Sequence, residues 1–354
     1  MPTTEDLRQL QELPLESKIQ LTLSKIYEYY THEQGNVYIS FSGGKDSAVL
    51  LHIVREYAKD IFPEFTKLPA VFDNTGLEYP EIQKFVKTFE NVVEIRPNLS
   101  FPEVITKYGY PVISKEVSTN IFYSRKGNQT RLLRLHGGLI DKNGVKSRFN
   151  CDKYLPLFNL PFKISSDCCR VMKKIPFKSY ERKTKTHVIT GEQAEESRNR
   201  KMHWLKGGCN FYDGERIVSH PMSFWTLQDI LQYIKKYNVE ICSVYGDVDY
   251  LDEKKEKLCC TKCQRTGCMF CAFGVHLETG ETRFQRLAKT HPKQYEYCIN
   301  GGKWIENSEY DEGCNSESVW NPQKIWVPSK DGLGLGNVFD MINAIYGKDF
   351  IKYE

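Results

Sequence analysis

The feature that most constrains this chain is a short apolar run that ends at a glycine pair and continues into a helix pattern. Residues 37–41 are Val-Tyr-Ile-Ser-Phe, which predicts a buried strand, and residues 47–58 have the apolar spacing of a helix. Between them stands Ser-Gly-Gly-Lys-Asp-Ser, residues 42–47. Because glycine lacks a Cβ, the N–H groups of such a loop approach a phosphate closely, and the helix N-terminus adds partial positive charge there. The pattern predicts a phosphate-binding loop.

Each residue type in the loop suits this task. The predicted phosphate-binding residues are Ser42, Gly43, Gly44, Lys45, Asp46 and Ser47. Lys45 supplies a full positive charge, and Asp46 is expected to hold Mg²⁺ or to cap the helix. The loop is not a Walker A motif, because Gly-x-x-x-x-Gly-Lys-Ser/Thr does not occur here. An ordinary Gly-Gly turn before a helix is the alternative interpretation.

Strand and helix patterns alternate along the chain, which predicts an α/β fold with a twisted, mostly parallel sheet and helices on both faces. Further strands are expected at 68–72, 92–95 and 186–190, and further helices at 16–34, 79–89, 101–107, 226–237 and 338–346. The expected organisation is an N-terminal helical segment at 1–35, a nucleotide-binding domain at 36–245, a cysteine-rich module at 246–300 and a tail with a helix at 301–354.

Positive charge is concentrated in one part of the sequence. The whole chain carries a net charge of +4, but residues 120–185 contain 16 lysines and arginines against four acidic residues. Such a segment favours a polyanionic partner such as a nucleic acid, the alternative being a solvated surface beside a pocket for one nucleotide. Residues 120–165 also contain several glycines and no clear period, so they are expected to form a long basic insertion or a mobile loop.

The location of the protein bears on its 12 cysteines. No apolar run is long enough to span a membrane, and residues 1–15 lack the apolar core of a signal peptide, so we expect a cytoplasmic protein. In a reducing compartment, clustered cysteines favour metal binding over a disulfide scaffold. Cys260-x2-Cys263-x4-Cys268-x2-Cys271 forms a local set that would suit zinc or iron, and free thiols are the alternative.

The loop and four other places resemble a known family. Phe41–Ser47 with the helix start Ala48–His52 is similar to the PP-loop of N-type ATP pyrophosphatases, and within them to the phosphoadenosine phosphosulfate (PAPS) reductase family. The other resembling segments are Val71–Gly76, Cys168-Cys169 with Pro176, Gly191–Arg200 and Pro221–Asp229. The resemblance spans about residues 36–275. It implies an adenine nucleotide alpha hydrolase-like fold that binds an adenine nucleotide.

The resemblance also implies roles for single residues. Asp73 and Gly76 would lie near the adenosine and Gly191 beside the nucleotide, while Glu196 and Arg200 would orient the phosphates or the acceptor. With the loop, this makes Lys45, Asp46, Glu196 and Arg200 the predicted catalytic residues. Gln193 stands where the family often has arginine. By resemblance to adenylylsulfate reductases, the four thiolates expected to hold a [4Fe–4S] cluster are those of Cys168, Cys169, Cys268 and Cys271.

The leading functional hypothesis is an enzyme that uses ATP and Mg²⁺ to adenylate an acceptor, releases pyrophosphate and supports sulfur transfer. The sulfur would come from a cluster, from a persulfide on Cys259, Cys260 or Cys263, or from a donor protein. The family's reductases usually have a degenerate loop and a C-terminal nucleophilic cysteine, whereas here the loop is intact and Cys314 is a poor match. The alternatives are a thiol-dependent PAPS or adenylylsulfate reductase and a nucleic-acid-binding component of a modification or defence system.

Overall fold

The computed structural model describes residues 1–212, 216–251, 256–314, 316 and 319–354. Contacts divide the chain into two units, and each is described by itself. Unit 1 contains residues 1–74, 78–96 and 176–267, and unit 2 contains residues 75–77, 97–175 and 268–354. The segment expected as a cysteine-rich module, 246–300, is divided between the units after Gly267. No helix in the described ranges combines the length and the apolar character needed to cross a bilayer.

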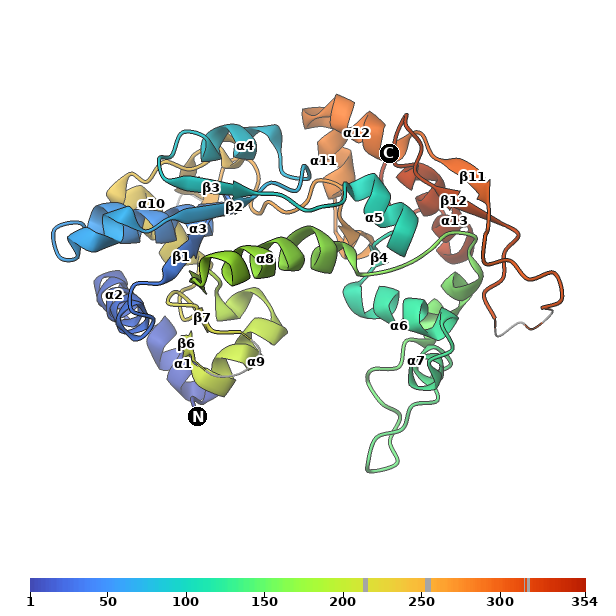
Figure 1. The fold of residues 1–354 in the computed structure, drawn as a ribbon, viewed down its shortest axis with the longest axis horizontal. Coiled ribbons are helices and arrows are strands. Elements are labelled where there is room, and N and C mark those ends of the chain that lie inside the picture. The colour runs from blue at the N-terminus through green and yellow to red at the C-terminus, as the bar shows by residue number, and fades with distance from the viewer. Residues whose placement is uncertain (213–215, 252–255, 315, 317–318) are drawn as a thin grey trace. The chain divides into compact units, whose positions relative to one another are not determined.

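Unit 1 is built around a six-stranded sheet with the strand order β3-β2-β1-β5-β7-β6 (Figure 1). Its strands are β1 (Val37–Ser40), β2 (Ala70–Asp73), β3 (Val92–Ile95), β5 (His187–Ile189), β6 (Asn210–Phe211) and β7 (Val218–Ser219). Every pairing is parallel except that of β6 with β7. The predicted mostly parallel sheet is therefore confirmed, with one antiparallel strand at its edge.

Both faces of this sheet are covered by helices. In β1, Val37 and Ile39 belong to a large core that also contains buried residues of α2, α3 and α10. Tyr38 points to the opposite face, where it packs with Phe177 and Tyr180 of α8. The alternation of side chains along a strand separates the two cores. The α-helices of unit 1 are α1 (Thr4–Gln11), α2 (Leu15–His32), α3 (Lys45–His52), α4 (Pro80–Val86), α8 (Ile175–Thr184), α9 (Arg198–Gly207) and α10 (Leu227–Tyr237).

A buried ion pair joins two of these helices. Thr226 caps α10 and forms a reciprocal capping box with Asp229, which satisfies exposed N–H groups of the first turn. The Asp229 carboxylate also lies 2.6 Å from the ammonium of Lys18 in α2. Short elements complete the unit: the π-helical turn at Ile53–Tyr57, the 3-10 turns at Pro63–Lys67, Ala194–Glu196 and Ser243–Tyr245, and the antiparallel pair β8 (Val248–Tyr250) and β9 (Leu258–Cys260).

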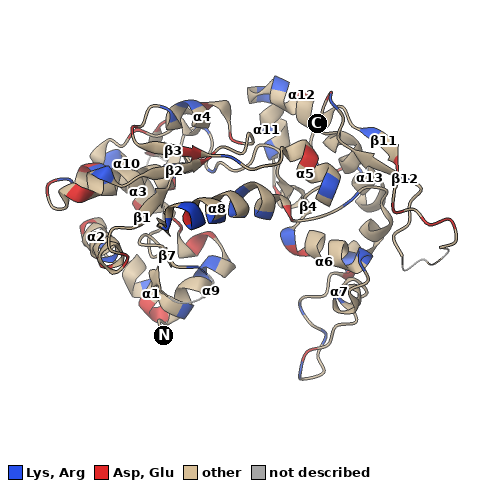
Figure 2. Cartoon of the chain, in the orientation of Figure 1, with Lys and Arg blue, Asp and Glu red and all other residues tan. Residues whose placement is uncertain are grey.

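Unit 2 is mainly helical. Its α-helices are α5 (Phe101–Tyr108), α6 (Lys115–Arg125), α7 (Gln129–Leu135), α11 (Arg283–Thr290), α12 (Pro292–Ile299) and α13 (Leu335–Tyr346). Two small sheets accompany them: β4 (Val112–Ile113) with β10 (Ala272–Phe273) in parallel, and β11 (Lys303–Glu306) with β12 (Lys324–Val327) antiparallel. Short helical turns lie at Asp152–Asn159, Arg170–Lys174 and Val275–Leu277. Figure 2 shows lysines and arginines on α6 and on the loop that follows α7.

The segment expected to form a long basic insertion or a mobile loop, 120–165, contains regular structure. It includes the end of α6, all of α7 and the 3-10 helix Asp152–Asn159. Asn128 caps α7 by accepting a hydrogen bond from the backbone N–H of Arg131. The guanidinium of Arg125 donates to the carbonyl groups of Leu157, Phe158, Leu160 and Phe162. These tertiary contacts fix a segment whose own apolar pattern is weak.

Candidate functional site

The phosphate loop, residues 42–47, connects the end of β1 to the start of α3. Its hydroxyl groups hold the turn: the N–H groups of Ser42 and Gly44 donate to Ser47 Oγ (3.2 Å) and Ser42 Oγ (3.3 Å). The Ser47 hydroxyl in turn donates to the carbonyl of Gly44 at 2.9 Å. The loop therefore has the strand–loop–helix setting that the sequence predicts, and its shape is stabilised by contacts among its own residues.

Two glycines are required by close packing around this loop. Gly43 has φ +71°, and a Cβ there would lie 2.8 Å from side-chain atoms of Ile82 and Val86 in α4. At Gly191, which follows β5, a Cβ would lie 3.0 Å from the carbonyl oxygen of Asp46. A side chain at either position would displace the loop.

Lys45 places a buried charge at the first turn of α3. Only 4% of Lys45 is exposed, and its Nζ lies 3.5 Å from Asp46 Oδ1 and 5.6 Å from the centre of the Tyr245 ring. Asp46 Oδ1 is buried and accepts no hydrogen bond from any described residue, so this ionic contact is its main compensation. A buried ammonium needs such partners, because removal from water is costly.

Tyr245 is a residue of this site that the sequence analysis did not single out. Its hydroxyl lies 2.6 Å from Thr266 Oγ1 and accepts a hydrogen bond from the backbone N–H of Lys45, and burial raises its pKa. The same hydroxyl oxygen would be 3.2 Å from a Cβ at Gly44. Tyr245 thus contacts both the backbone and the ammonium of the loop, although no motif of the sequence contains it.

Glu196 and Arg200 lie in an ion-pair network beyond the end of β5. The Glu196 carboxylate accepts the backbone N–H of Gln193 at 3.2 Å and pairs with Arg200 and, at 2.9 Å, with Arg265. Arg200 also pairs with Glu192 at 3.3 Å. The chain that carries these residues starts at Gly191, which touches the loop backbone, so unit 1 brings the network and the loop to the same edge of the sheet.

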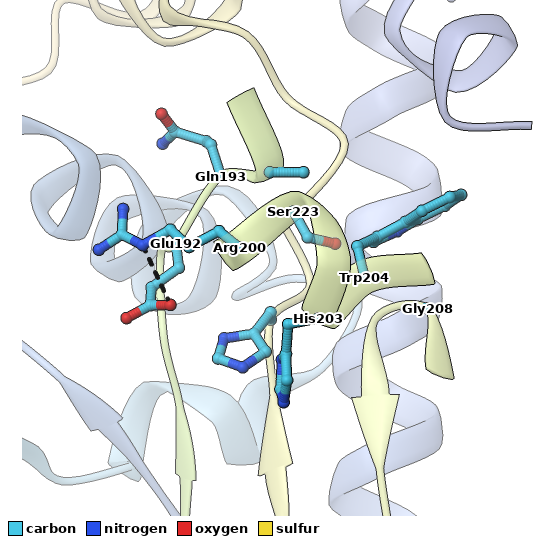
Figure 3. Close-up of a pocket in the computed structure, with 9 residues that line it drawn as sticks. Glu192, Gln193, Arg200, His203, Trp204, Gly208 and Ser223 are labelled. Carbon is cyan, nitrogen blue, oxygen red and sulfur yellow. Dashed lines mark ion pairs between the residues drawn. The ribbon is translucent and has the colours of Figure 1, made fainter. Parts of the chain in front are cut away.

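A small basic pocket adjoins this network (Figure 3). It has a volume of about 10 Å³, room for about one water molecule, and is lined by Glu192, Gln193, Ala194, Arg200, His203, Trp204, Gly208, His220 and Ser223. The imidazole rings of His203 and His220 are 5.3 Å apart, and His220 shares a 2.6 Å hydrogen bond with Thr190. Burial, together with the nearby His203 and Arg200, lowers the pKa of His220 to about 3. His220 is therefore neutral near pH 7.

The two residues expected near the adenosine fall in different units. Asp73 is the last residue of β2, the strand paired with β1, and is buried in unit 1. Gly76 has φ +75°, belongs to unit 2 and has open space where a Cβ would stand. Asp73 thus shares the sheet edge with the phosphate loop.

The four cysteines of the predicted long-range set all belong to unit 2. Sγ of Cys168 and Sγ of Cys169 are 4.0 Å apart. The hydrogen bond from Cys168, with the charges of Lys115 and Lys173, lowers the pKa of Cys169 to about 5, against the effect of burial. The pKa of Cys168 is raised by its hydrogen bond to Cys169, by burial, and by the neighbouring thiols.

The other two thiols of this set lie in the electrostatic range of the pair. Cys271 and Cys268 both contribute to the raised pKa of Cys168, and the pKa of Cys271 is raised chiefly by burial. Among the described residues, no three His, Cys, Asp or Glu side chains stand close enough to hold a metal ion. The alternative local set is divided, with Cys260 and Cys263 in unit 1.

Comparisons with known proteins place these features in a family context. The model of the phosphoadenosine phosphosulfate reductase domain family matches residues 36–119 and 143–273. Two relatives are called sulfate adenylyltransferase subunit 2. The one from Pseudoalteromonas translucida is 24% identical over 247 residues, 68% of either chain, and the one from Zymomonas mobilis is 25% identical over 240 residues, 67% of this chain and 69% of the relative. A solved structure of phosphoadenylyl-sulfate reductase from Candida auris, a phosphate complex, gives a TM-score of 0.34 at 13% identity over 69% of this chain and 91% of that one.

Proposed function

We propose, from the premise that this chain belongs to the phosphoadenosine phosphosulfate reductase domain family, that unit 1 binds ATP and transfers its adenylyl group to an acceptor with release of pyrophosphate. The observation that carries the proposal is the intact loop at the start of α3, with the ammonium of Lys45 buried beside it. Free N–H groups of a helix N-terminus and a buried cation together favour a polyphosphate. An enzyme that cleaves ATP needs these groups at the leaving pyrophosphate.

The residues of the loop divide the work of binding. The N–H groups of Gly43, Asp46 and Ser47 and the hydroxyl of Ser42 would donate to the β- and γ-phosphates, with Lys45 neutralising their charge. Asp73, on the adjacent strand, would lie near the adenosine, as would Gly76 by family resemblance. The buried Asp46 Oδ1 is the oxygen that would hold Mg²⁺, which supplies further charge neutralisation when bound.

The proposed reaction is displacement at the α-phosphorus. An oxygen of the acceptor forms a bond to this phosphorus, and the bond to the oxygen that bridges to the β-phosphate breaks, so pyrophosphate leaves. Glu196 orients Arg200, whose guanidinium lines the small basic pocket and suits an anionic acceptor. The adenylate formed is then open to attack by sulfur, which displaces AMP.

The names of the relatives indicate which acceptor to test first. Sulfate adenylyltransferase subunit 2 acts, by its name, on sulfate, an anion whose oxygens would accept hydrogen bonds from the guanidinium of Arg200. The word "subunit" in those names also supports a partner chain, and we extend this to the present protein as part of the proposal.

Unit 2 would supply a [4Fe–4S] site through Cys168, Cys169, Cys268 and Cys271. The low pKa of Cys169 provides a thiolate, and the nearby Lys115 and Lys173 offset the negative charge of four thiolates. Such a cluster, when bound, supplies electron transfer or a labile sulfide. The thiols would have to draw closer on loading, since no metal-binding group is formed among the described residues.

The test follows the α-phosphate. Protein purified without oxygen is incubated with Mg²⁺, sulfate and ATP labelled at the α-phosphorus, with inorganic pyrophosphatase added to remove product. We expect labelled adenylylsulfate, or AMP once a sulfur donor is present, together with two phosphates per adenylyl group transferred, both from hydrolysis of the released pyrophosphate, and no labelled ADP. Formation of ADP and phosphate alone would overturn the proposal.

A thiol-dependent reduction of PAPS or adenylylsulfate is the second candidate, and Cys169 is the observation that favours it. The hydrogen bond from Cys168 and the charges of Lys115 and Lys173 lower the pKa of Cys169 and favour its thiolate. This thiolate can form an S–S bond to the sulfur of an adenylylated sulfate as the S–O bond to the nucleotide phosphate breaks and the nucleotide leaves. Calorimetric binding of ATP and of PAPS separates the two candidates. Tight ATP binding with weak PAPS binding supports adenylation, and the reverse result supports reduction.

A further inference from the structure

The family leaves one basic part of unit 2 without a counterpart. The family match stops at residue 119 and resumes at 143, so the end of α6, α7 and the start of the following turn are additions to the shared domain, whereas residues 143–150 lie inside the match. Residues 120–150 contain seven lysines and arginines and a single acidic residue, Asp141. We call residues 120–150 the basic arm. Neither nucleotide binding nor the cysteine set uses it.

The basic arm is an ordered structure. α7 packs against α6, and the chain then forms an antiparallel turn in which Ile140 pairs with Lys146. The carboxylate of Asp141 accepts the N–H groups of Asn143 (2.8 Å) and Val145 (3.0 Å). The single acidic side chain of the arm is therefore engaged in shaping the turn, as is usual for aspartate.

The exposed side chains of the arm combine cations with apolar groups. Phe149 is 42% exposed, and the guanidinium groups of Arg134 and Arg148 lie 5.4 Å and 5.0 Å from the centre of its ring. Ile140 and Val145 expose 62% and 60% of their surface. Lys126, Lys142 and Lys146 are also exposed, and Figure 2 shows the positive charge along this part of the chain. An exposed ring with two cations beside it suits a ligand that offers both a flat face and negative charge.

We propose that the basic arm binds single-stranded nucleic acid. Its exposed lysines and Arg148 would contact phosphates, while the exposed ring of Phe149 would let an unpaired base stack on it. Duplex DNA is a weaker match, because its bases are already stacked on one another and would not stack on Phe149. A helix that reads the major groove must also enter it, and α7 is followed directly by the turn at residues 140–146. An acidic protein would satisfy the charges but would not need the exposed ring. The surface therefore favours single strands, and DNA and RNA share the required chemistry.

The strength of binding should depend on salt in a predictable way. Each phosphate contacted on a single strand contributes a slope of about −0.7 to log K against log salt. Four exposed cations, Lys126, Lys142, Lys146 and Arg148, give an expected slope of about −3. Phe149 adds an affinity that hardly varies with salt, since stacking releases no counterions.

The experiment measures fluorescence anisotropy of labelled oligothymidine and oligouridine of about 16 nucleotides, and of a duplex control, between about 50 and 200 mM salt. The charge variant is a single protein that carries three substitutions, Lys126→Glu, Lys142→Glu and Arg148→Glu. Its control carries Lys293→Glu, Lys303→Glu and Lys330→Glu, three exposed lysines of the same unit outside the arm. Phe149→Ala and Phe149→Tyr form a second pair that removes or keeps the ring.

We expect the charge variant to bind at least tenfold more weakly and to reduce the slope by about 2, while its control stays within about threefold of the parent. Phe149→Ala should lose about tenfold at all salt concentrations, and Phe149→Tyr should lose little. Equal losses in the two charge variants would overturn the proposal, as would tighter binding of the duplex. Circular dichroism of each variant verifies folding, and ATP binding is measured in parallel because it does not depend on this inference.

Discussion

The phosphate loop and the four-cysteine set are two sites that the chain constructs in opposite ways. The loop is six consecutive residues whose hydroxyl and N–H groups bond to one another, and its shape is largely set before any ligand arrives. The cysteine set takes Cys168 and Cys169 from one segment and Cys268 and Cys271 from another, about 100 residues later. The pKa of Cys169 depends in addition on Lys115, in α6. One site is therefore encoded locally, and the other exists only once unit 2 has folded.

This difference determines how each site responds to substitution. A change inside the loop acts on ligand contacts directly and leaves the fold of the unit in place. A change in the cysteine set alters charges that several thiols share, so its effect is expected to spread across the set. The following predictions test this contrast, from the largest expected effect to the smallest.

Lys45→Met should have the largest effect on the loop. The substitution keeps the length of the side chain but removes the charge that, in the proposed reaction, faces the leaving pyrophosphate, so we expect turnover of ATP to fall by a factor of about 100 or more. The measurement is pyrophosphate release under saturating ATP. Lys59→Met, at an exposed lysine of the same unit, is the control and should stay within about twofold. Unchanged turnover in a folded Lys45→Met protein would show that the loop is not where phosphate chemistry occurs.

Cys169→Ser should prevent the cysteine set from holding iron. Serine provides neither the thiolate nor the shared hydrogen bond with Cys168, so bound iron and visible charge-transfer absorption should be lost after anaerobic reconstitution. ATP binding should be unchanged, because the loop lies in unit 1. The matched variant is Cys260→Ser, which should keep the iron. If Cys260→Ser lost iron while Cys169→Ser retained it, the local cysteine set would be the metal site.

Gly191→Ala should give an intermediate effect at the boundary of the loop. The added Cβ would lie 3.0 Å from the carbonyl oxygen of Asp46, a backbone atom that moves only with the loop. We expect ATP affinity to fall about tenfold and the free energy of unfolding to fall by about 1–3 kcal/mol. Gly267→Ala is the control, since a Cβ there has no atom within 4 Å. ATP affinity is measured by calorimetry and stability by urea unfolding. Equal effects of Gly191→Ala and Gly267→Ala in these measurements would count against close packing at Gly191.

Much of unit 1 could be predicted from the sequence, because its signals are local. Strand periodicity places β1 and β3 within a residue of their observed ends, and the glycine pair marks the loop between strand and helix. The capping residue Thr226 likewise marks the start of α10. These features depend on neighbours in sequence, which is why the pattern alone reveals them.

The features that were missed depend on contacts between distant residues. α7 buries only Leu135 and is stabilised by its cap and by α6, so its sequence has little helical pattern. Tyr245 reaches the loop from a turn about 200 residues away, and His220 looks like an isolated histidine until the pocket forms around it. Proximity of the two cysteine pairs was predicted only from family resemblance, since spacing alone also allowed the local set.

The smallest predicted effect concerns His220, and it tests the unit that carries the loop, because the pocket around His220 makes the stability of unit 1 sensitive to mild acid. The folded pKa of His220 is about 3, below its ordinary 6.5, so between these values the unfolded chain binds a proton that the folded chain excludes. Stability contributed by this group is constant above pH 6.5 and falls as the pH drops from 6.5 toward 3, by at most about 1.4 kcal/mol per pH unit. Urea unfolding of the parent and of His220→Gln, between about pH 7.5 and 5, measures this slope. The variant should show a shallower loss of stability, whereas His136→Gln, at an exposed histidine, should follow the parent. Identical slopes for the parent and His220→Gln would mean that water or a counterion reaches the imidazole, and that the pocket beside Arg200 is less closed than its lining implies.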